Sequence, residues 1–293
     1  MSATQLTIQP SSMPADDAPP GKRIARAVFK RLPPSNVSLS LGKLLTRLLL
    51  RPGKKHQLVK ARFAGRIEME LDLGDFTSND LYCLDRHYES VTLSLWTRLA
   101  RQAETVVDLG SHIGTYALMA ADANPHARVF AVEANRANFE RLAGHAAPYS
   151  NITPVQAAIA DHHATLWFCM DPLNTGGGYL SETPAVDREC YPIETRTLGE
   201  LCRAESISQV DLMKIDVEGY EYRLLTGADD FWRCTSPKHL IVEIARDTQH
   251  PNGIQAALRA MRARGYHARL VQSLHVMPWG HADDLANWHF WRA

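Results

Sequence analysis

The chain has 293 residues, of which 45% are hydrophobic and 22% are charged. These proportions are typical of a soluble globular protein and exclude a globally disordered chain, and the length suits one large α/β domain with an appendage. Lys and Arg balance Asp and Glu, so the formal net charge is zero. A neutral chain offers no general electrostatic attraction to nucleic acid, and we expect no nucleic-acid partner.

The N-terminal part divides into a tail and a basic extension. Residues 1–20 are polar and rich in Pro, which predicts a disordered tail. Residues 21–87 form a predicted N-terminal extension and cap, with twelve Lys or Arg and no Asp or Glu between Lys22 and Arg62. The apolar run Leu41–Leu50 contains two basic residues and is shorter than the roughly 20 residues that span a bilayer. It suits either a helix packed on the domain, which we favour, or an anchor in weak contact with an anionic surface.

The five cysteines are dispersed and show no C-x-x-C spacing, which indicates a reducing compartment. The first residues lack the pattern of a secretory signal, so we predict a cytoplasmic protein. The pair His162 and His163 has no neighbours at zinc-ligand spacing, and we predict no essential metal. The sequence does not indicate an oligomeric state. The cysteines are Cys83, Cys169, Cys190, Cys202 and Cys234.

Hydrophobic periodicity predicts an alternation of strands and helices. Within 63–76 apolar and polar residues alternate, as in a half-exposed strand, and a helix is expected to follow; the spacing in 88–103 predicts an amphipathic helix. Residues 88–293 then form the predicted catalytic domain, because strands that alternate with helices indicate a parallel sheet covered on both faces. Strands are predicted at 105–109, 128–133, 152–159, 210–216, 239–244, 268–271 and 287–292, and helices after Gly114 and at 138–145, 220–226 and 254–264.

The segment Asp108–Gly114, D-L-G-S-H-I-G, turns from the first of these strands into a helix. In open α/β sheets this turn meets the ligand. Its spacing differs from the glycine patterns that bind pyrophosphate or nucleotide phosphates, which predicts a ligand without phosphate. S-adenosylmethionine fits, since Asp108 can meet its ammonium group directly or through water. Gly110 and Gly114 keep side chains out of its path, and Ser111 and His112 in the same turn are predicted to contact the cofactor as well.

Glu133 ends the next strand, nineteen residues after Gly114, where its carboxylate can accept hydrogen bonds from both ribose hydroxyls. Alternatively, Gly110 only ends a strand and Glu133 only starts a helix, where an acidic residue is electrostatically favoured. The occurrence of both residues at this spacing favours cofactor binding. Asp161 follows the third strand and suits the adenine amino group or an ordinary turn. The sequence therefore predicts an S-adenosylmethionine site.

A second informative stretch is D-L-M-K-I-D-V-E-G-Y-E, which starts at Asp211. Lys214 and Asp216 share one face of a strand that otherwise has the pattern of a buried one. They form either a structural ion pair or, with Glu218 at the exposed strand end, a group that contacts the substrate. We favour the second interpretation and expect Asp216 and Glu218 to contact the acceptor or to act as base. His112 is a weaker candidate for that role.

These motifs, together with A-V-E-A-N, Q-A-A-I-A-D and T-R-T-L-G-E-L, resemble the FkbM family of methyltransferases from about Tyr88 to Leu270. The resemblance implies a class I, Rossmann-like methyltransferase fold with a mainly parallel seven-stranded sheet, S-adenosylmethionine as cofactor, and methylation of a hydroxyl. It implies functional roles for Asp108, Gly110, Gly114 and Glu133, and for the signature residues Lys214, Asp216, Glu218 and Gly219. Ala134 and His112 depart from the family's usual residues, and neither departure removes a hydrogen-bonding group from the site.

The predicted function is O-methylation of a hydroxyl on a small-molecule or glycan acceptor, either a sugar or a secondary metabolite. The alternatives are a non-catalytic module that binds S-adenosylmethionine and a nucleic-acid methyltransferase. D-V-E-G follows the fourth strand where enzymes that methylate base amino groups carry Pro-Pro and an aromatic residue, which weakens the second alternative. A nicotinamide-dependent oxidoreductase lacks support because the pyrophosphate glycines are missing.

Overall fold

The computed structural model describes residues 17–32, 56–171, 174–227, 231–232, 235–245, 253–273 and 285–292. The predicted tail and the run Leu41–Leu50 lie largely or wholly outside these residues. No helix in the described ranges is long and apolar enough to cross a membrane.

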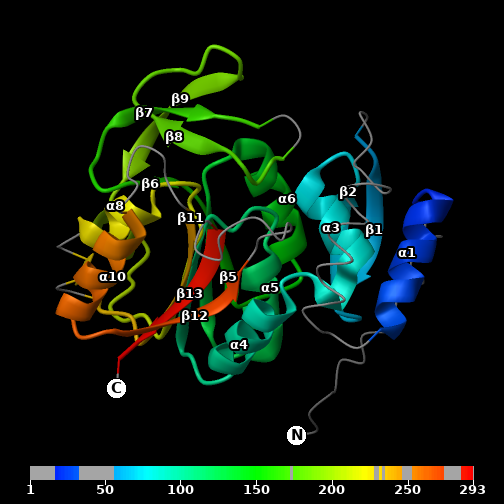
Figure 1. Cartoon of the computed structure of the whole chain (residues 1–293), viewed down its shortest axis with the longest axis horizontal. Coiled ribbons are helices and arrows are strands. Elements are labelled where there is room, and N and C mark those ends of the chain that lie inside the picture. The colour runs from blue at the N-terminus through cyan, green and yellow to red at the C-terminus, as the bar shows by residue number, and fades with distance from the viewer. Residues whose placement is uncertain are drawn as a thin grey trace, which may run out of the picture.

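A seven-stranded sheet forms the centre of the molecule, with strand order β12-β13-β11-β10-β3-β4-β5 (Figure 1). The strands from β11 to β5 are parallel, and β13 runs antiparallel to both of its neighbours. This arrangement confirms the predicted class I methyltransferase fold, with its last strand antiparallel. The strands are β3 (Thr105–Leu109), β4 (Arg128–Glu133), β5 (Ile152–Gln156), β10 (Leu212–Ile215), β11 (His239–Ala245), β12 (His267–Ser273) and β13 (Leu285–Trp291).

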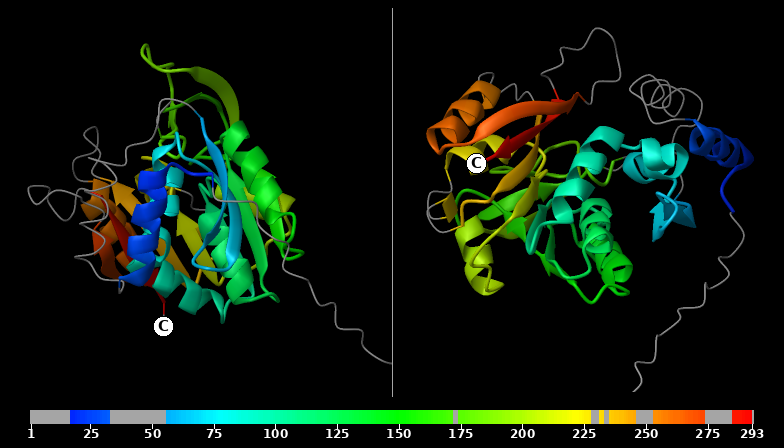
Figure 2. Two further views of the ribbon diagram at one scale, coloured as in Figure 1. Left: turned by 90° about the vertical axis from the view of Figure 1, so that its right-hand side faces the viewer. Right: turned by 90° about the horizontal axis from the view of Figure 1, so that it is seen from below.

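Helices cover both faces of this sheet, and a hydrophobic cluster lies under each layer. One face carries α4 (Ser90–Ala100), α5 (Thr115–Ala123) and α6 (Arg136–Ala146). The other carries α7 (Leu198–Ala204), α8 (Glu221–Thr226) and α10 (Gly253–Ala263), as Figure 2 shows from below. The helices predicted at 88–103, 138–145, 220–226 and 254–264 are confirmed as α4, α6, α8 and α10.

The N-terminal extension packs against the first of these layers. It contains α1 (Pro20–Arg31), the hairpin of β1 (Leu58–Phe63) and β2 (Ile67–Asp72), α3 (Phe76–Leu84) and the short 3-10 helix η1 (Asp85–His87). The predicted strand within 63–76 and the helix after it are therefore β2 and α3. One hydrophobic cluster joins the hairpin to α4 and α5 without a break.

Two basic residues of α1, Lys22 and Arg26, face inward. Lys22 Nζ donates to the backbone oxygen of Leu73 at 3.1 Å, and Arg26 forms an ion pair of 3.2 Å with Asp85. Both basic side chains are buried, whereas the apolar residues Ile24 and Val28 are exposed. A charge-assisted bond to a buried carbonyl or carboxylate stabilises a fold more than a neutral bond does. These two contacts hold α1 to the rest of the N-terminal extension, at Leu73 and at η1.

A smaller four-stranded sheet, order β6-β9-β7-β8, stands beyond the carboxyl ends of the parallel strands (Figure 1). Its strands are β6 (Ala158–Ile159), β7 (Thr165–Cys169), β8 (Tyr179–Ser181) and β9 (Cys190–Arg196). The structure joins Cys169 and Cys190 on the paired strands β7 and β9 in a disulfide. The sequence predicted one strand over residues 152–159, whereas the structure divides these residues into β5 and β6 and adds this sheet.

Candidate functional site

The predicted cofactor turn connects β3 to α5 and passes very close to the end of β10. Gly110 adopts a φ of +74°, and a Cβ atom there would lie 1.7 Å from the backbone oxygen of Asp216. Gly114 adopts a φ of +100°, and its Cβ would lie 2.7 Å from Leu142 Cδ1 on α6. Glycine adopts both positive φ values without strain, and at position 110 any other residue would also clash with the backbone of Asp216. The two glycines therefore bring the turn against Asp216 on one side and allow α5 to pack on α6 on the other.

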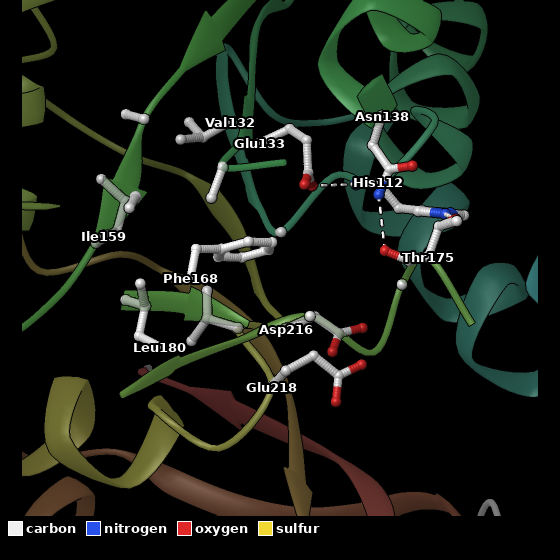
Figure 3. A pocket seen from close by; sticks show the side chains of 17 residues that line it. His112, Val132, Glu133, Asn138, Ile159, Phe168, Thr175, Leu180, Asp216 and Glu218 are labelled. Atoms are coloured by element: carbon white, nitrogen blue, oxygen red, sulfur yellow. Dashed lines mark hydrogen bonds between the residues drawn. The ribbon is translucent and has the colours of Figure 1, made fainter. Parts of the chain in front are cut away.

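Glu133 ends β4 with its carboxylate beside this turn. Its Oε2 accepts a hydrogen bond of 2.8 Å from the backbone N–H of His112, and its Oε1 accepts one of 2.8 Å from that of Asn135. Each oxygen keeps a further lone pair, and the residue lines a pocket (Figure 3). The placement matches the ribose contact predicted for Glu133, which stays a prediction.

Burial raises the pKa of Glu133 to about 7, above the ordinary value for Glu. The ionised carboxylate is the form that accepts two hydroxyl donors, so this form is lost as the pH falls through 7. We therefore expect the affinity for S-adenosylmethionine to be about fivefold lower at pH 6 than at pH 7, which calorimetric titration at both values measures. If the affinity stays the same between pH 6 and pH 7, the ionisation of Glu133 does not control binding.

The pocket lies at the carboxyl ends of β3, β4 and β10, where Gly110, Glu133 and Asp216 line it. Figure 3 shows apolar side chains on one side of Glu133 and polar ones on the other. The apolar side comes from Val132 and from the small sheet and the residues that lead into it, with Ile159, Phe168 and Leu180. A Cβ on Gly178 would lie 2.5 Å from the Phe168 ring, so glycine lets this segment cross the ring closely.

Thr175 connects the glycine-rich segment Gly176–Gly178, which directly follows it, to the rest of the site. Its backbone N–H and its hydroxyl donate to Asp75 Oδ1, at 2.7 and 3.0 Å. Its backbone oxygen accepts from Asn138 Nδ2 at 2.8 Å. His112 Nε2 lies 2.8 Å from the Thr175 hydroxyl oxygen. The segment is thus held to α3, to α6 and to the cofactor turn, which the sequence did not predict.

His112 is neutral in this arrangement, because burial lowers its pKa to about 4. The Thr175 hydroxyl gives its proton to Asp75, so Nε2 of His112 is the donor in their contact. With Nε2 engaged in this way, the side chain helps to hold Thr175 in place. This geometry argues against His112 as the base.

Four predicted cofactor residues, Asp108, Ser111, Gly114 and Asp161, lie outside the pocket lining. Asp108 is buried, accepts a hydrogen bond of 3.0 Å from the backbone N–H of Ala117, and has a pKa that burial raises to about 6. Ser111 donates its hydroxyl to the backbone oxygen of Asp108 at 2.8 Å. Asp161 pairs with His162 at 2.7 Å. The structure therefore gives each of these residues a contact within the protein and leaves the predicted cofactor contacts of Asp108 and Asp161 as predictions.

The fourth parallel strand delivers the signature residues to the same edge. Lys214 is buried on β10, and its Nζ lies 2.8 Å from Asp216 Oδ2 and 5.1 Å from the centre of the Tyr116 ring. Burial alone would lower the pKa of Lys214, but the charges of Asp216 and Glu243 raise it above its ordinary value. Lys214 is thus a fixed cation that orients Asp216, while Asp216 and Glu218 themselves line the pocket.

Glu218 lies in a strained turn, with a φ of +50° that non-glycine residues rarely adopt. Gly219 follows with a φ of +99°, and the buried carboxylate of Glu221 accepts from the backbone N–H groups of Val217 and Gly219 at 2.8 and 3.0 Å. Glu221 therefore fixes the shape of the turn. Desolvation and the charge of Asp216 raise the pKa of Glu218 to about 8.

Residues 108–268 match the family model described as the methyltransferase FkbM domain, which is more than half of the chain. The chain belongs to the FkbM methyltransferase family. This membership confirms the resemblance seen in the sequence and the prediction of a methyltransferase that uses S-adenosylmethionine. Within the described residues, no three His, Cys, Asp or Glu side chains are placed to hold a metal ion.

One curated relative of this FkbM chain is the hexuronic acid methyltransferase AglP of Haloferax volcanii, with 27% identity over 162 residues. The alignment covers 55% of this chain and 64% of AglP, which is less than two thirds of that protein's length. As its name states, AglP is a methyltransferase of a hexuronic acid.

Solved structures similar to the FkbM chain include the O-methyltransferase TomG from Streptomyces achromogenes, in complex with S-adenosylmethionine. It has 13% identity and a TM-score of 0.45, and the match covers 92% of this chain and 96% of TomG. Fibrillarin from Aeropyrum pernix has 12% identity and a TM-score of 0.42, with coverage of 69% and 74%. Likenesses of this degree carry no argument about activity.

Proposed function

We propose that this protein transfers the methyl group of S-adenosylmethionine to a hydroxyl of a sugar or secondary-metabolite acceptor. The observation that carries the proposal is the convergence of Glu133, the Gly110 turn and Asp216 on one pocket at the carboxyl ends of three adjacent parallel strands. A carboxylate for the ribose, a turn free of side chains and an apolar wall are the features that such a cofactor requires.

The pocket residues suggest how the cofactor is held. Glu133 would accept hydrogen bonds from the ribose hydroxyls, and the apolar wall with Ile159, Phe168 and Leu180 would contact the adenine ring. The methionine end would lie along the Gly110 turn, with the buried Asp108 behind it. Asp161 remains the proposed partner of the adenine amino group. When bound, S-adenosylmethionine supplies an electrophilic methyl group.

The proposed acceptor site lies at Asp216 and Glu218. Forming the new O–CH3 bond breaks the bond between sulfur and the methyl carbon, and the hydroxyl proton leaves the acceptor. Asp216 is positioned to hold the hydroxyl and take this proton, since Lys214 fixes its Oδ2 and its side chain lines the pocket. Alignment of the two reactants is worth up to about 7–11 kcal/mol in well-oriented systems.

The name of the relative AglP supports a sugar as acceptor, since that enzyme is described as acting on a hexuronic acid.

A cytoplasmic location is also part of the proposal, because the wide spacing of the cysteines suits a reducing compartment. The disulfide between Cys169 and Cys190 counts against it, since such bonds are rare in the cytosol. Free thiols are alkylated in intact cells, and mass spectrometry of the protein then shows whether Cys169 and Cys190 are joined there. A free, alkylated pair would support the cytoplasmic location.

The test of the activity is a search for a methylated product. The purified protein is incubated with a cell extract and S-adenosylmethionine that carries a deuterated methyl group, and the mixture is analysed by mass spectrometry. We expect at least one extract component to gain the labelled methyl group on oxygen. The Glu133→Ala variant serves as control. A protein that binds S-adenosylmethionine but labels nothing would be a non-catalytic binding module instead.

A further inference from the structure

A second group of polar side chains lies beside Asp216 and outside the lining of the cofactor pocket. Ile215 on β10 pairs with Val242 on β11, so Asp216 and Glu243 follow in neighbouring positions. Glu243 in turn pairs with Asn287 on the antiparallel strand β13. Asp216, Glu243 and Asn287 therefore form a row across three adjacent strands at the edge where the acceptor is proposed to bind.

Glu89, which immediately precedes α4, completes this group. It precedes α4 in a left-handed conformation, with a φ of 40°, and makes no side-chain capping bond to that helix. Its Oε2 instead accepts hydrogen bonds from the Tyr116 hydroxyl at 2.5 Å and from Asn287 Nδ2 at 3.4 Å. Glu89 also interacts electrostatically with Lys214 and Glu243. The strained backbone thus directs a buried carboxylate away from its own helix and toward the row.

Asn287 gives an independent sign that this group awaits a ligand. The residue is 0% exposed, and its amide is directed at Glu89 by the Nδ2 contact. Its Oδ1 has no hydrogen-bond partner among the described residues. Buried amide oxygens are nearly always bonded, and a ligand hydroxyl would supply the missing donor.

The charge of the group restricts that ligand. Lys214 is 1% exposed and already bonded to Asp216, so it cannot turn to meet an incoming anion. Burial and the charge of Asp216 raise the pKa of Glu243 well above its ordinary value. Surroundings that favour the protonated form of a carboxyl group disfavour any further negative charge.

We infer that Glu89, Glu243 and Asn287 form, with Asp216, an acceptor site that takes the hydroxyl groups of a neutral sugar or an amino sugar and excludes a uronate. This inference rests on the proposed function and narrows its substrate class. Carboxylates accept hydrogen bonds from sugar hydroxyls or an ammonium group, and the Asn287 oxygen accepts one more. A carboxylate on the same sugar would face two or more carboxyl groups and no free cation in the described site.

The first test identifies the sugar that receives the label. The product labelled with a deuterated methyl group is isolated from the extract and hydrolysed to its component sugars, and these are separated by charge. We expect the label on a neutral or cationic sugar. Label on a uronate would overturn the inference and leave the proposed O-methylation standing, whereas the absence of any labelled product would remove both.

The second test separates the charge of Glu89 from its structural contact. In Glu89→Gln the side-chain oxygen still accepts from Tyr116, but the charge is gone. We expect kcat/KM for the isolated acceptor to fall about tenfold, the difference between a charged and a neutral hydrogen-bond partner, while the affinity for S-adenosylmethionine changes less than about twofold. Glu140→Gln makes the same charge change on the exposed face of α6 and should match the wild type. An unchanged kcat/KM in Glu89→Gln would exclude Glu89 from the acceptor site.

Discussion

Replacing Glu133 by Ala is expected to weaken the binding of S-adenosylmethionine by at least about 100-fold. The proposed contact uses two hydroxyl donors on one carboxylate, and each bond to a charged group contributes about 1.5–3 kcal/mol. Both oxygens of Glu133 are already fixed by backbone N–H groups, so the acceptor is held in position before the ligand arrives. Isothermal titration calorimetry of the purified variant measures the loss.

The variant must also be shown to fold. Removal of the Glu133 carboxylate leaves the N–H groups of His112 and Asn135 without that acceptor at the wall of the pocket, where water can replace it. We expect thermal unfolding to stay cooperative, with a lowered midpoint. Glu133→Gln keeps one acceptor oxygen and should bind with intermediate affinity. Wild-type affinity in Glu133→Ala would contradict the ribose assignment.

Asp216→Asn should lower turnover by about 10²–10⁴-fold and leave the affinity for S-adenosylmethionine nearly unchanged. The range is that of general acid–base catalysis, which the amide cannot provide. Because the Asn oxygen still accepts from Lys214, the geometry at the end of β10 is expected to persist. Initial rates with the isolated acceptor and calorimetric titration of the cofactor measure the two effects separately.

The same substitution removes a charge beside a buried lysine. Loss of one partner of a buried ion pair costs about 3–5 kcal/mol, but Glu89 and Glu243 remain near Lys214 and reduce this cost. The unfolding midpoint of Asp216→Asn is therefore recorded with the kinetics. A variant that stays folded and loses cofactor binding would place Asp216 in the cofactor site instead of the acceptor site.

The main sheet could be predicted from the sequence because its strands are short, β-branched and buried. The segments 105–109 and 128–133 have this composition and became β3 and β4, and the two last predicted strands became β12 and β13. Parallel strands bring their carboxyl ends to one edge, which is why Gly110, Glu133 and Asp216 could be expected together.

The small sheet could not be predicted in the same way. Tyr179–Ser181 is a strand of three half-buried residues, too short to show a periodic pattern in the sequence, and it pairs with β7. The glycine run before it indicates only flexibility. Consequently Phe168 and Leu180, which form the apolar wall, carried no local signal. The contact of Thr175 with Asp75 joins residues 100 positions apart and follows only from the folded arrangement.

The N-terminal hairpin sets a practical limit on how the gene can be shortened. The match to the family begins at Asp108, yet Asp75 holds the glycine-rich segment and the backbone of Glu70 bonds to His145 and Arg141 on α6. A truncated protein that begins at Asp108 would lack the hydrophobic residues of the hairpin that pack against α5, and it would also lack Glu89. The smallest recombinant fragment that keeps the site intact therefore starts upstream of β1.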